Sequence, residues 1–309
     1  MKIAFLFSGQ GAQYPGMLKD LYETEPAAKG VFDSADRSLG RSISDLCFSG
    51  TQEALNLTHN TQPCMLAADL AAGMALSAHG VEPQAVAGFS LGEYAALTFA
   101  KAFEVEDAFE MVQLRADAMQ EAVAPSEGAM AAMVGGTPEQ IEQICARVSD
   151  GYVVAANYNS PVQTVVSGTV AGVDQAIALA AAEKIRAIKL AVSAPFHCDL
   201  MRPAAQRLEA FFAGKSFVAP CIPVYMNVDG LAHVQAEQIP ALLVAQAMCP
   251  VRWVQTLQNM QADDIDTFIE CGPGKTLTGL VKKTLKGVAV YRVEDRKTLE
   301  ETLTALGAR

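Results

Sequence analysis

Charged residues are scarce in this sequence, and positive ones are the scarcer. Lys and Arg number 23 against 34 Asp and Glu in 309 residues, which gives a net charge of −11. Since a basic surface supplies most of the affinity of nucleic-acid binding, we expect no nucleic-acid partner. Hydrophobic residues make up 51% of the chain, too many for a disordered protein. The length predicts a large core and suggests about two domains, at roughly 150 residues each.

Long hydrophobic runs are also missing. Gly or charged residues interrupt every apolar stretch well before the ~20 residues that a membrane span needs. The N-terminal stretch Ile3–Phe7 is too short for a signal peptide and leads straight into a Gly-rich turn. We therefore expect a soluble, cytoplasmic protein with no membrane partner, and a monomer is our default expectation.

The cysteines and histidines are too scattered for a metal site. The seven Cys contain no C-x-x-C pair, and no two of the four His lie within five residues of each other. A disulfide framework or a zinc site would need clustered spacing. The sequence predicts reduced thiols, mostly in the core, and no metal site.

Short apolar runs alternate with longer helix-like stretches, which is typical of an α/β fold with a largely parallel sheet. The expected strands are 3–7, 85–89, 224–228, 267–270 and 288–293. The expected helices include 63–78, 92–100, 105–122, 201–212 and 275–285. Such sheets usually place their sites at the carboxyl ends of the strands. We therefore expect the functional residues at 8–13, at Ser90 and at 271–275.

The middle of the chain follows a different pattern. A strand at 130–134 precedes Thr137, Pro138 and Gln140, which together predict a capped helix that runs to about residue 148. Strands at 153–157 and 163–167, a helix from about 169 to 183 and a strand at 186–191 follow, with a turn at 159–161. The order βαββαβ is the ferredoxin-like split arrangement. We predict a small inserted domain at 124–193, within a larger domain formed by 1–123 and 194–309.

The strongest local signal is Gly88-Phe89-Ser90-Leu91-Gly92, a G-x-S-x-G motif between an expected strand and an expected helix. This context is that of a nucleophile elbow, in which glycines permit a tight turn that exposes the serine hydroxyl. The helix that follows directs its amides toward any oxyanion formed there. An ordinary turn is the alternative, and the flanking pattern favours a nucleophile.

Three further features are weaker. A serine hydroxyl needs a base, and His197 is the candidate because it lies where the inserted domain rejoins the main one, although a structural His remains the alternative. The loop Ser8–Gln13 offers a main-chain amide as a second oxyanion donor, or is an ordinary loop. Arg115 has apolar neighbours on its expected helix, so its guanidinium is either buried or solvated. No acidic third member of a triad stands out.

Together these segments resemble the malonyl-CoA:acyl carrier protein transacylases and the related acyltransferase domains of fatty acid and polyketide synthases. The resemblance spans about 270 residues and rests on motifs in a fixed order: 7–13, 61–63, 88–93, the segment around Arg115, 159–161, 195–197, 227–229, 250–253 and 272–275. It implies an α/β-hydrolase-like core with a ferredoxin-like insert. The residues leave open whether the carrier serves fatty acid or polyketide synthesis.

The resemblance also implies residue roles. Ser90 would be the nucleophile and His197 its general base, oriented by the backbone carbonyl of Arg252. The backbone amides of Gln10 and Leu91 would form the oxyanion hole. The reaction would be a ping-pong transfer from malonyl-CoA to the phosphopantetheine thiol of acyl carrier protein, through a malonyl-serine. No cofactor is implied, because the coenzyme A thioester is a substrate.

Substrate selection would fall to three side chains. Arg115 would bind the free carboxylate of the malonyl group by a two-pronged hydrogen bond. Phe196 resembles the bulky residue of malonyl-selective relatives, and Asn159 would contact the substrate. Phe89 departs from the His that is usual before the nucleophile in this family. Cys198, next to the expected base, is a rival nucleophile or, more in keeping with its context, a packing residue.

Two other functions fit parts of the sequence. A serine hydrolase, such as an esterase, thioesterase or patatin-like lipase, would use the same elbow but would give Arg115 no task. A degenerate scaffold of a larger synthase would not need Ser90, His197 and Arg115 together. For an acidic carrier we expect a basic docking surface, and there are two candidates: Lys275, Lys282, Lys283 and Lys286 in one stretch, or Lys184, Arg186 and Lys189 on the insert.

Overall fold

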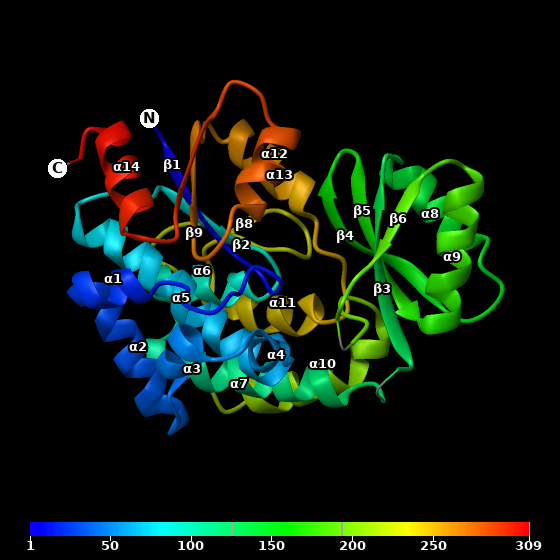
Figure 1. Ribbon diagram of the computed structural model, residues 1–309, viewed down its shortest axis with the longest axis horizontal. Coiled ribbons are helices and arrows are strands. Elements are labelled where there is room, and N and C mark those ends of the chain that lie inside the picture. Colours follow the sequence, from blue (N-terminus) through cyan, green and yellow to red (C-terminus); the bar gives the residue numbers. More distant parts are fainter. Residues whose placement is uncertain (125, 193, 309) are drawn as a thin grey trace.

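The computed structural model describes residues 1–124, 126–192 and 194–308. Within them the chain forms a mixed α/β fold with two separate sheets, one of six strands and one of four (Figure 1). The four-stranded sheet, green in Figure 1, lies at one end of the molecule, and the larger sheet lies within the rest of the chain.

The larger sheet is parallel except at one edge. Its strand order is β10-β9-β1-β2-β7-β8, and only β8 runs antiparallel to its neighbour. The strands are β1 (Ile3–Phe7), β2 (Ala85–Gly88), β7 (Val224–Tyr225), β8 (Ala232–His233), β9 (Thr267–Cys271) and β10 (Ala289–Val293). The five predicted strands of the larger domain are therefore confirmed. The strand expected at 224–228 ends early, because the amide of Asn227 bonds to the carboxyl of Glu93 instead of a neighbouring strand.

The register of this sheet brings three loops to one edge. Phe7 pairs with Gly88 on one side and with Cys271 on the other, so β1, β2 and β9 end level with one another. The loops that follow them begin at the same edge, where the sequence placed the site. Along β1 the side chains alternate between two cores: Phe5 and Phe7 face one, and Ala4 and Leu6 face the other. A parallel sheet covered on both faces requires this arrangement.

Helices cover both faces of the larger sheet. The helices of this larger part of the chain, some of which pack only on other helices, are α1 (Lys19–Thr24), α2 (Pro26–Leu39), α3 (Ile43–Ser49), α4 (Gln52–Asn56), α5 (Thr58–Ala78), α6 (Gly92–Phe99), α7 (Val105–Glu121), α10 (Arg202–Phe212), α11 (Ile239–Gln246), α12 (Trp253–Ala262), α13 (Thr276–Thr284) and α14 (Arg296–Leu306). Two 3₁₀ turns lie at Asp199–Met201 and Ala236–Gln238. No helix in the described residues is long and apolar enough to cross a membrane.

One predicted helix boundary is wrong. The sequence places the start of a helix at Pro63, whereas α5 begins five residues earlier, at Thr58. Proline inside a helix lacks the amide that would bond to the carbonyl four residues before it. That carbonyl, of His59, accepts a hydrogen bond from Arg41 Nη2 at 3.1 Å. The substitute donor explains how the helix continues through Pro63.

The smaller sheet has the element order that the sequence predicts. Its strands and helices are β3 (Gly128–Val134), α8 (Pro138–Ala146), β4 (Val153–Ser160), β5 (Gln163–Thr169), α9 (Val170–Ala182) and β6 (Arg186–Lys189). The strands are antiparallel in the order β4-β5-β3-β6. The predicted capping box of Thr137 and Gln140 is present at the start of α8. The domain limits at 123/124 and 193/194 stay predictions, and Ser193 and Arg309 lie outside the described residues.

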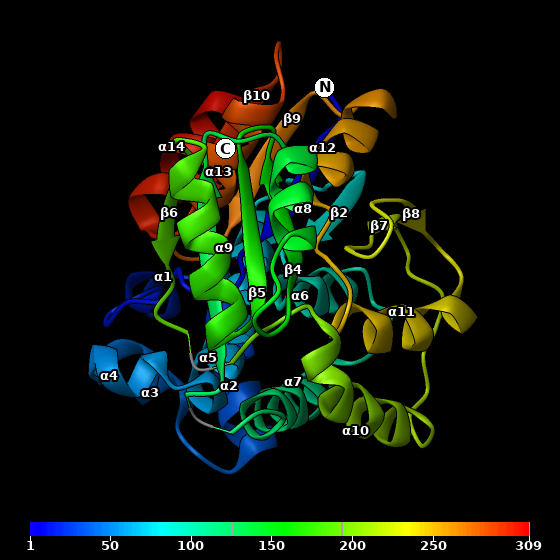
Figure 2. The same ribbon diagram turned by 90° about the vertical axis from the view of Figure 1, so that its right-hand side faces the viewer.

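The two faces of the smaller sheet have different neighbours. Helices α8 and α9 cover the outer face (Figure 2), where Ala131, Met133 and Val166 form a separate core. On the inner face, Met130 and Val165 join the core of the main part. Strand β4 is tied to the main part by main-chain hydrogen bonds with Val251. The inner face of the smaller sheet therefore packs against the main part of the chain.

Candidate active site

Ser90 lies at a sharp turn between β2 and α6, and its backbone φ of +53° is in the left-handed region. The flanking glycines make the turn possible. A Cβ on Gly88 would lie 1.9 Å from main-chain atoms of Gly92, and a Cβ on Gly92 would lie 2.3 Å from the carbonyl oxygen of Phe7. The elbow is thus packed too closely for side chains on either flank, and Ser90 projects at the carboxyl edge of the sheet.

His197 is the partner of this hydroxyl. Ser90 Oγ lies 2.7 Å from His197 Nε2, across 107 residues of sequence. His197 Nδ1 lies 2.8 Å from the carbonyl oxygen of Gln246. Because a carbonyl can only accept, Nδ1 carries the proton and Nε2 is free to accept from the serine. Burial, assisted by the charge of Arg115, lowers the pKa of His197 to about 4, so the imidazole is neutral at pH 7.

The carbonyl that orients this imidazole corrects an expectation. It belongs to Gln246 and not to Arg252. Arg252 precedes α12, and its carbonyl accepts from the amide and hydroxyl of Thr256 in the first turn of that helix. Gln246 is the last residue of α11, where a carbonyl has no partner within the helix. The helix end therefore leaves an acceptor for the histidine.

The Arg115 side chain is buried, with 2% of its surface exposed. Its guanidinium donates to Gln62 Oε1 at 2.8 Å, Gln246 Oε1 at 2.9 Å and Ser90 Oγ at 3.1 Å. No carboxylate in the described part of the chain lies within ion-pair distance, and Nε has no hydrogen-bond partner there. Burial lowers the pKa of Arg115, yet a guanidinium stays charged at neutral pH. A positive charge therefore lies beside the serine without a counter-ion in contact.

The expected oxyanion donors lie next to the elbow. Gly9 packs against it so closely that a Cβ there would be 2.7 Å from the carbonyl oxygen of Phe89. Gln10, one residue on, and Leu91, directly after the nucleophile, both line the pocket that contains Ser90. In the described residues no acceptor is bonded to either amide. Two free N–H groups beside a serine hydroxyl can stabilise a tetrahedral oxyanion.

A pocket of about 220 Å³ surrounds these groups. Its wall on the insert side includes Met130, Asn157, Asn159 and Val165, and its opposite wall includes residues of the first loop and of α13. Phe196 and Asn159 both line it, and Asn159 Oδ1 is buried without a hydrogen-bond partner among the described residues. Both residues therefore lie where the sequence expects substrate contacts.

Phe89 and Cys198 receive structural explanations. The Phe89 ring packs on Trp253 with 5.3 Å between centroids and lines the pocket, so this part of the wall is apolar. Cys198 is buried, its thiol donates to the carbonyl of Pro195 at 3.2 Å, and burial raises its pKa. This is the packing residue that its context suggested. Within the described residues no three His, Cys, Asp or Glu side chains are grouped to hold a metal ion.

Four polar residues at the site had no role assigned from sequence. Gln62 and Gln246 hold Arg115, and Asn227 Oδ1 accepts from the amide of Ser90 at 2.7 Å. Glu93 is wholly buried beneath them, and burial raises its pKa to about 8 against the hydrogen bonds that lower it. Gln62, Glu93 and Asn227 lie within recognised motifs, which was the available signal, whereas Gln246 lies in none.

Comparisons with known proteins agree with this geometry. A family model described as the acyl transferase domain matches residues 4–301. The malonyl CoA-acyl carrier protein transacylase of Bacillus subtilis strain 168 is 42% identical over 308 residues, which cover 99% of this chain and 97% of that protein.

Solved structures are similar over the whole fold. An acyl-carrier-protein S-malonyltransferase from Burkholderia pseudomallei 1710b superposes with a TM-score of 0.96 at 41% identity, covering 98% of this chain and 100% of that one. A malonyl-transacylase in complex with a type II polyketide synthase acyl-carrier protein superposes with a TM-score of 0.96 at 38% identity, covering 99% and 100%. The family model spans residues 4–301, a range that contains the elbow, its histidine and the buried arginine, and the relatives cover nearly the whole chain, so this chain belongs to the acyl transferase family.

Proposed function

We propose that this protein transfers the malonyl group of malonyl-CoA to the phosphopantetheine thiol of acyl carrier protein, through a malonyl ester on Ser90. The observation that carries the proposal is the buried Arg115, whose charge has no carboxylate partner among the described residues and whose Nη2 lies 3.1 Å from the nucleophile. A free carboxylate on the acyl group supplies the missing counter-ion.

The first half-reaction forms the acyl-enzyme. As Ser90 Oγ attacks the thioester carbonyl carbon, its proton moves to His197 Nε2, 2.7 Å away. The carbonyl oxygen becomes an oxyanion between the amides of Gln10 and Leu91. When this intermediate collapses, the C–S bond breaks and the proton on Nε2 passes to the departing coenzyme A thiolate. The products are malonyl-Ser90 and free coenzyme A.

The second half-reaction reverses the roles. The carrier thiol gives its proton to His197 Nε2 while its sulfur attacks the ester carbonyl, and the same two amides hold the oxyanion. The C–O bond then breaks, and the serine oxygen takes the proton back. Every proton and electron pair is accounted for by Ser90, His197 and the two thiols. We therefore propose that the transfer needs no cofactor and that the coenzyme A thioester acts only as a substrate.

Selectivity for malonyl follows from charge and shape. An acetyl group would leave the desolvated guanidinium of Arg115 unpaired, which costs binding free energy. The Phe196 ring lies in the same pocket and limits the space for a branched acyl group. Asn159 Oδ1, buried and unpartnered in the described structure, is an acceptor for an amide or hydroxyl of the pantetheine arm.

The alternative functions explain less. A serine hydrolase would use Ser90 and His197 but would leave the buried Arg115 unexplained, and the relatives are named as a transacylase and an S-malonyltransferase. A degenerate scaffold would not require the 2.7 Å contact between hydroxyl and imidazole. Product analysis separates a hydrolase from the proposed transferase, because a hydrolase releases free malonate and a transferase yields malonyl carrier protein.

The experiment is intact-mass analysis after mixing with malonyl-CoA. We expect the wild type to gain one malonyl unit on a peptide that contains Ser90, and Ser90→Ala to gain none. Subsequent addition of carrier protein bearing phosphopantetheine should move the malonyl unit to the carrier. A wild type that gains no malonyl unit, or that carries it elsewhere on the chain, would disprove the proposal.

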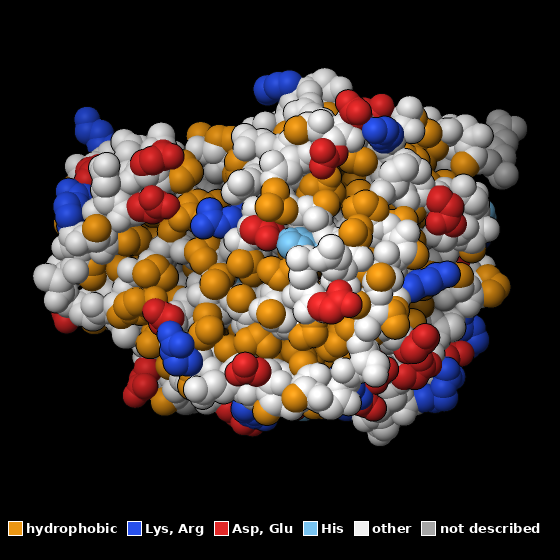
Figure 3. All heavy atoms as spheres, turned by 180° about the vertical axis from the view of Figure 1, so that it is seen from behind, with side chains coloured by type: hydrophobic (Ala, Val, Ile, Leu, Met, Phe, Trp, Pro, Cys, Tyr) orange, Lys and Arg blue, Asp and Glu red, His pale blue; other side chains and the backbone are white. Residues whose placement is uncertain are grey.

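For carrier docking, the stretch 275–286 is favoured over the insert. In the described structure, its four lysines are exposed and form no ion pair, whereas Lys189 on the insert is paired with Asp174 at 2.7 Å. The face in Figure 3 shows basic and acidic side chains interspersed, without a large basic cluster. Charge reversal at Lys282 and Lys283 should slow transfer to the carrier and leave acylation by malonyl-CoA unchanged. An unaffected transfer would exclude this stretch.

We also propose a cytoplasmic location and a monomeric state. All seven cysteines lie within the described residues, and none of them forms a disulfide. Thiols that remain unpaired are typical of a reducing compartment. A stable disulfide in protein isolated from cells under alkylating conditions would contradict the location.

A further inference from the structure

Glu93 is a wholly buried carboxyl that no step of the proposed reaction uses. It follows the elbow directly, at the start of α6. Its Oε2 accepts the amide of Asn227 at 2.5 Å, and its Oε1 accepts Gln246 Nε2 at 3.0 Å. Both oxygens therefore accept N–H hydrogen bonds, which lower the pKa of this carboxyl against the effect of burial, and no cation in the described residues lies within ion-pair distance of them.

The side chain of Gln246 connects this carboxyl to Arg115. Gln246 Nε2 donates to Glu93 Oε1 and to the carbonyl of Ser90, at 3.0 and 2.8 Å. Gln246 Oε1 accepts from Arg115 Nη2 at 2.9 Å. A primary amide has nearly the same shape when its oxygen and nitrogen exchange places, so its neighbours decide the orientation. Here two acceptors on one side, the Glu93 carboxyl and the Ser90 carbonyl, and a donor on the other turn the amide oxygen toward the guanidinium.

A second arm leads from Glu93 to the nucleophile. The same carboxyl fixes the main chain of Asn227, whose side chain accepts from the amide of Ser90 and donates to the carbonyl of Gly88, each at 2.7 Å. The elbow and the guanidinium are thus held by one buried group. The guanidinium lies one amide away from Glu93, so the carboxyl does not compete with a substrate carboxylate for it.

We propose that Glu93 is a positioning residue for acyl selectivity, which acts on Arg115 through the side chain of Gln246 and does not touch the substrate. The inference rests on the proposed function, because it assigns Arg115 to the acyl carboxylate. It goes beyond that function in naming the group that aims the guanidinium.

Glu93→Gln is the sharpest perturbation. The variant keeps the shape but offers one acceptor to two donors, so its NH₂ must face either the Asn227 amide or Gln246. If the new NH₂ faces Gln246, the Gln246 amide must turn over, and the NH₂ of Gln246 then faces Arg115. Loss of one hydrogen bond to a charged group predicts about a tenfold or greater fall in the malonyl-to-acetyl preference. The half-saturating malonyl-CoA concentration should rise, and acetyl transfer should fall much less.

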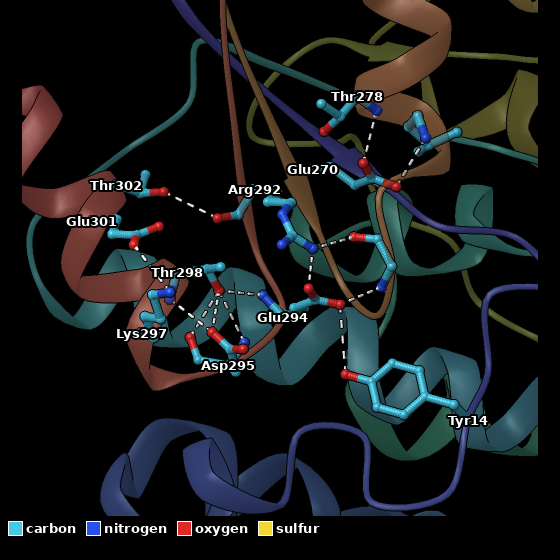
Figure 4. Close-up of polar contacts among 12 residues, drawn as sticks. Tyr14, Glu270, Thr278, Arg292, Glu294, Asp295, Lys297, Thr298, Glu301 and Thr302 are labelled. Carbon is cyan, nitrogen blue, oxygen red and sulfur yellow. Dashed lines mark hydrogen bonds and ion pairs between the residues drawn. The ribbon is translucent and has the colours of Figure 1, made fainter.

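Two further variants make the test specific. Gln246→Met keeps the main-chain carbonyl that orients His197 but removes the connecting amide. It should lower the same preference, and the double variant should be no worse than the more severe single one. Glu270→Gln is the matched control, because Glu270 is also a buried carboxyl with two N–H donors, from Leu277 and Thr278 (Figure 4). It should lower thermal stability without changing the preference.

The measurement is single-turnover acylation of Ser90 by malonyl-CoA and by acetyl-CoA, with circular dichroism as the check on folding. A wild-type preference in both folded variants, Glu93→Gln and Gln246→Met, would overturn the inference. If Glu93→Gln does not fold, Gln246→Met decides, and an unchanged preference there also overturns it. A wild type that malonyl-CoA does not acylate would instead overturn the proposed function.

Discussion

Replacing Arg115 by Met tests the origin of selectivity directly. Methionine keeps an unbranched side chain in a buried position and removes the charge. Two hydrogen bonds from the guanidinium to a malonyl carboxylate, at about 1.5–3 kcal/mol each, amount to roughly 3–6 kcal/mol. At about 1.4 kcal/mol per tenfold, kcat/KM for malonyl-CoA should fall by roughly 10²–10⁴.

Acetyl-CoA should respond differently to the same change. It has no carboxylate to lose, and the variant no longer holds an unpaired buried charge beside the bound acyl group. Its kcat/KM should therefore change much less than that of malonyl-CoA, or rise. The kcat/KM values for both substrates come from rapid-quench measurements of Ser90 acylation, monitored by mass spectrometry. Equal losses for the two substrates, or less than a tenfold loss for malonyl-CoA, would refute the reasoning.

Two control variants separate charge from geometry. Arg115→Lys keeps the charge but cannot present two parallel N–H groups, so its malonyl kcat/KM should lie between wild type and Arg115→Met. Arg207→Met removes an arginine that pairs with Glu121 at 2.6 Å on the surface, with side chains 43% and 67% exposed. Such a pair contributes about 0–1 kcal/mol to stability, and acylation should be unchanged.

Three other predictions concern stability. The pKa of His197 falls from 6.5 to about 4 on folding. Between these values the unfolded chain binds a proton that the folded one does not, so the free energy of unfolding decreases as pH falls, by about 3 kcal/mol over the whole interval. Denaturant unfolding at pH 7 and at pH 4.5 should therefore show a smaller decrease in this free energy for His197→Gln than for the wild type. Gly88→Ala should unfold at a much lower temperature than wild type, while Gly279→Ala, where a Cβ meets nothing within 4 Å, should be neutral or up to about 1 kcal/mol more stable. Glu294 accepts from the amide of Gly274 at 2.7 Å and pairs with Arg292 (Figure 4), so Glu294→Gln should lower the free energy of unfolding by about 1–3 kcal/mol; an unchanged denaturation midpoint would contradict this role.

Local patterns in the sequence account for much of the fold. The strand 3–7 and the start of the helix after the elbow match the structure to the residue, because Gly, Pro and polar residues bound each apolar run. The capping box at Thr137 is likewise set by neighbouring side chains. No helix was predicted within 14–57, where α1–α4 lie. Three of these helices have only five to seven residues, too few to show a period, although Pro26 and Gly40 mark both ends of α2.

The burial of Arg115 could not be decided from its own helix. Helix α7 packs against three other helices, α5, α10 and α2, so an apolar neighbour on the helix does not tell which of them the Arg115 side chain faces. What fixes the inward orientation is a set of acceptors far away in sequence, Gln62 Oε1 at 53 residues and Gln246 Oε1 at 131. Hydrogen bonds across such separations have no local pattern to reveal them.

The carbonyl that orients His197 was even harder to predict from the sequence than the burial of Arg115. A main-chain carbonyl is common to every residue type, so only its position can distinguish it, and that position is the last residue of a helix. Arg252 lies in a recognised motif and Gln246 does not, yet the carbonyl of Arg252 already accepts hydrogen bonds from Thr256 in the first turn of α12. The unpaired carbonyl at the end of α11 has no such internal use and meets His197 Nδ1 at 2.8 Å. The side chain of Gln246 then adds the connection to Arg115, so one residue aligns both the base and the group that we assign to substrate recognition.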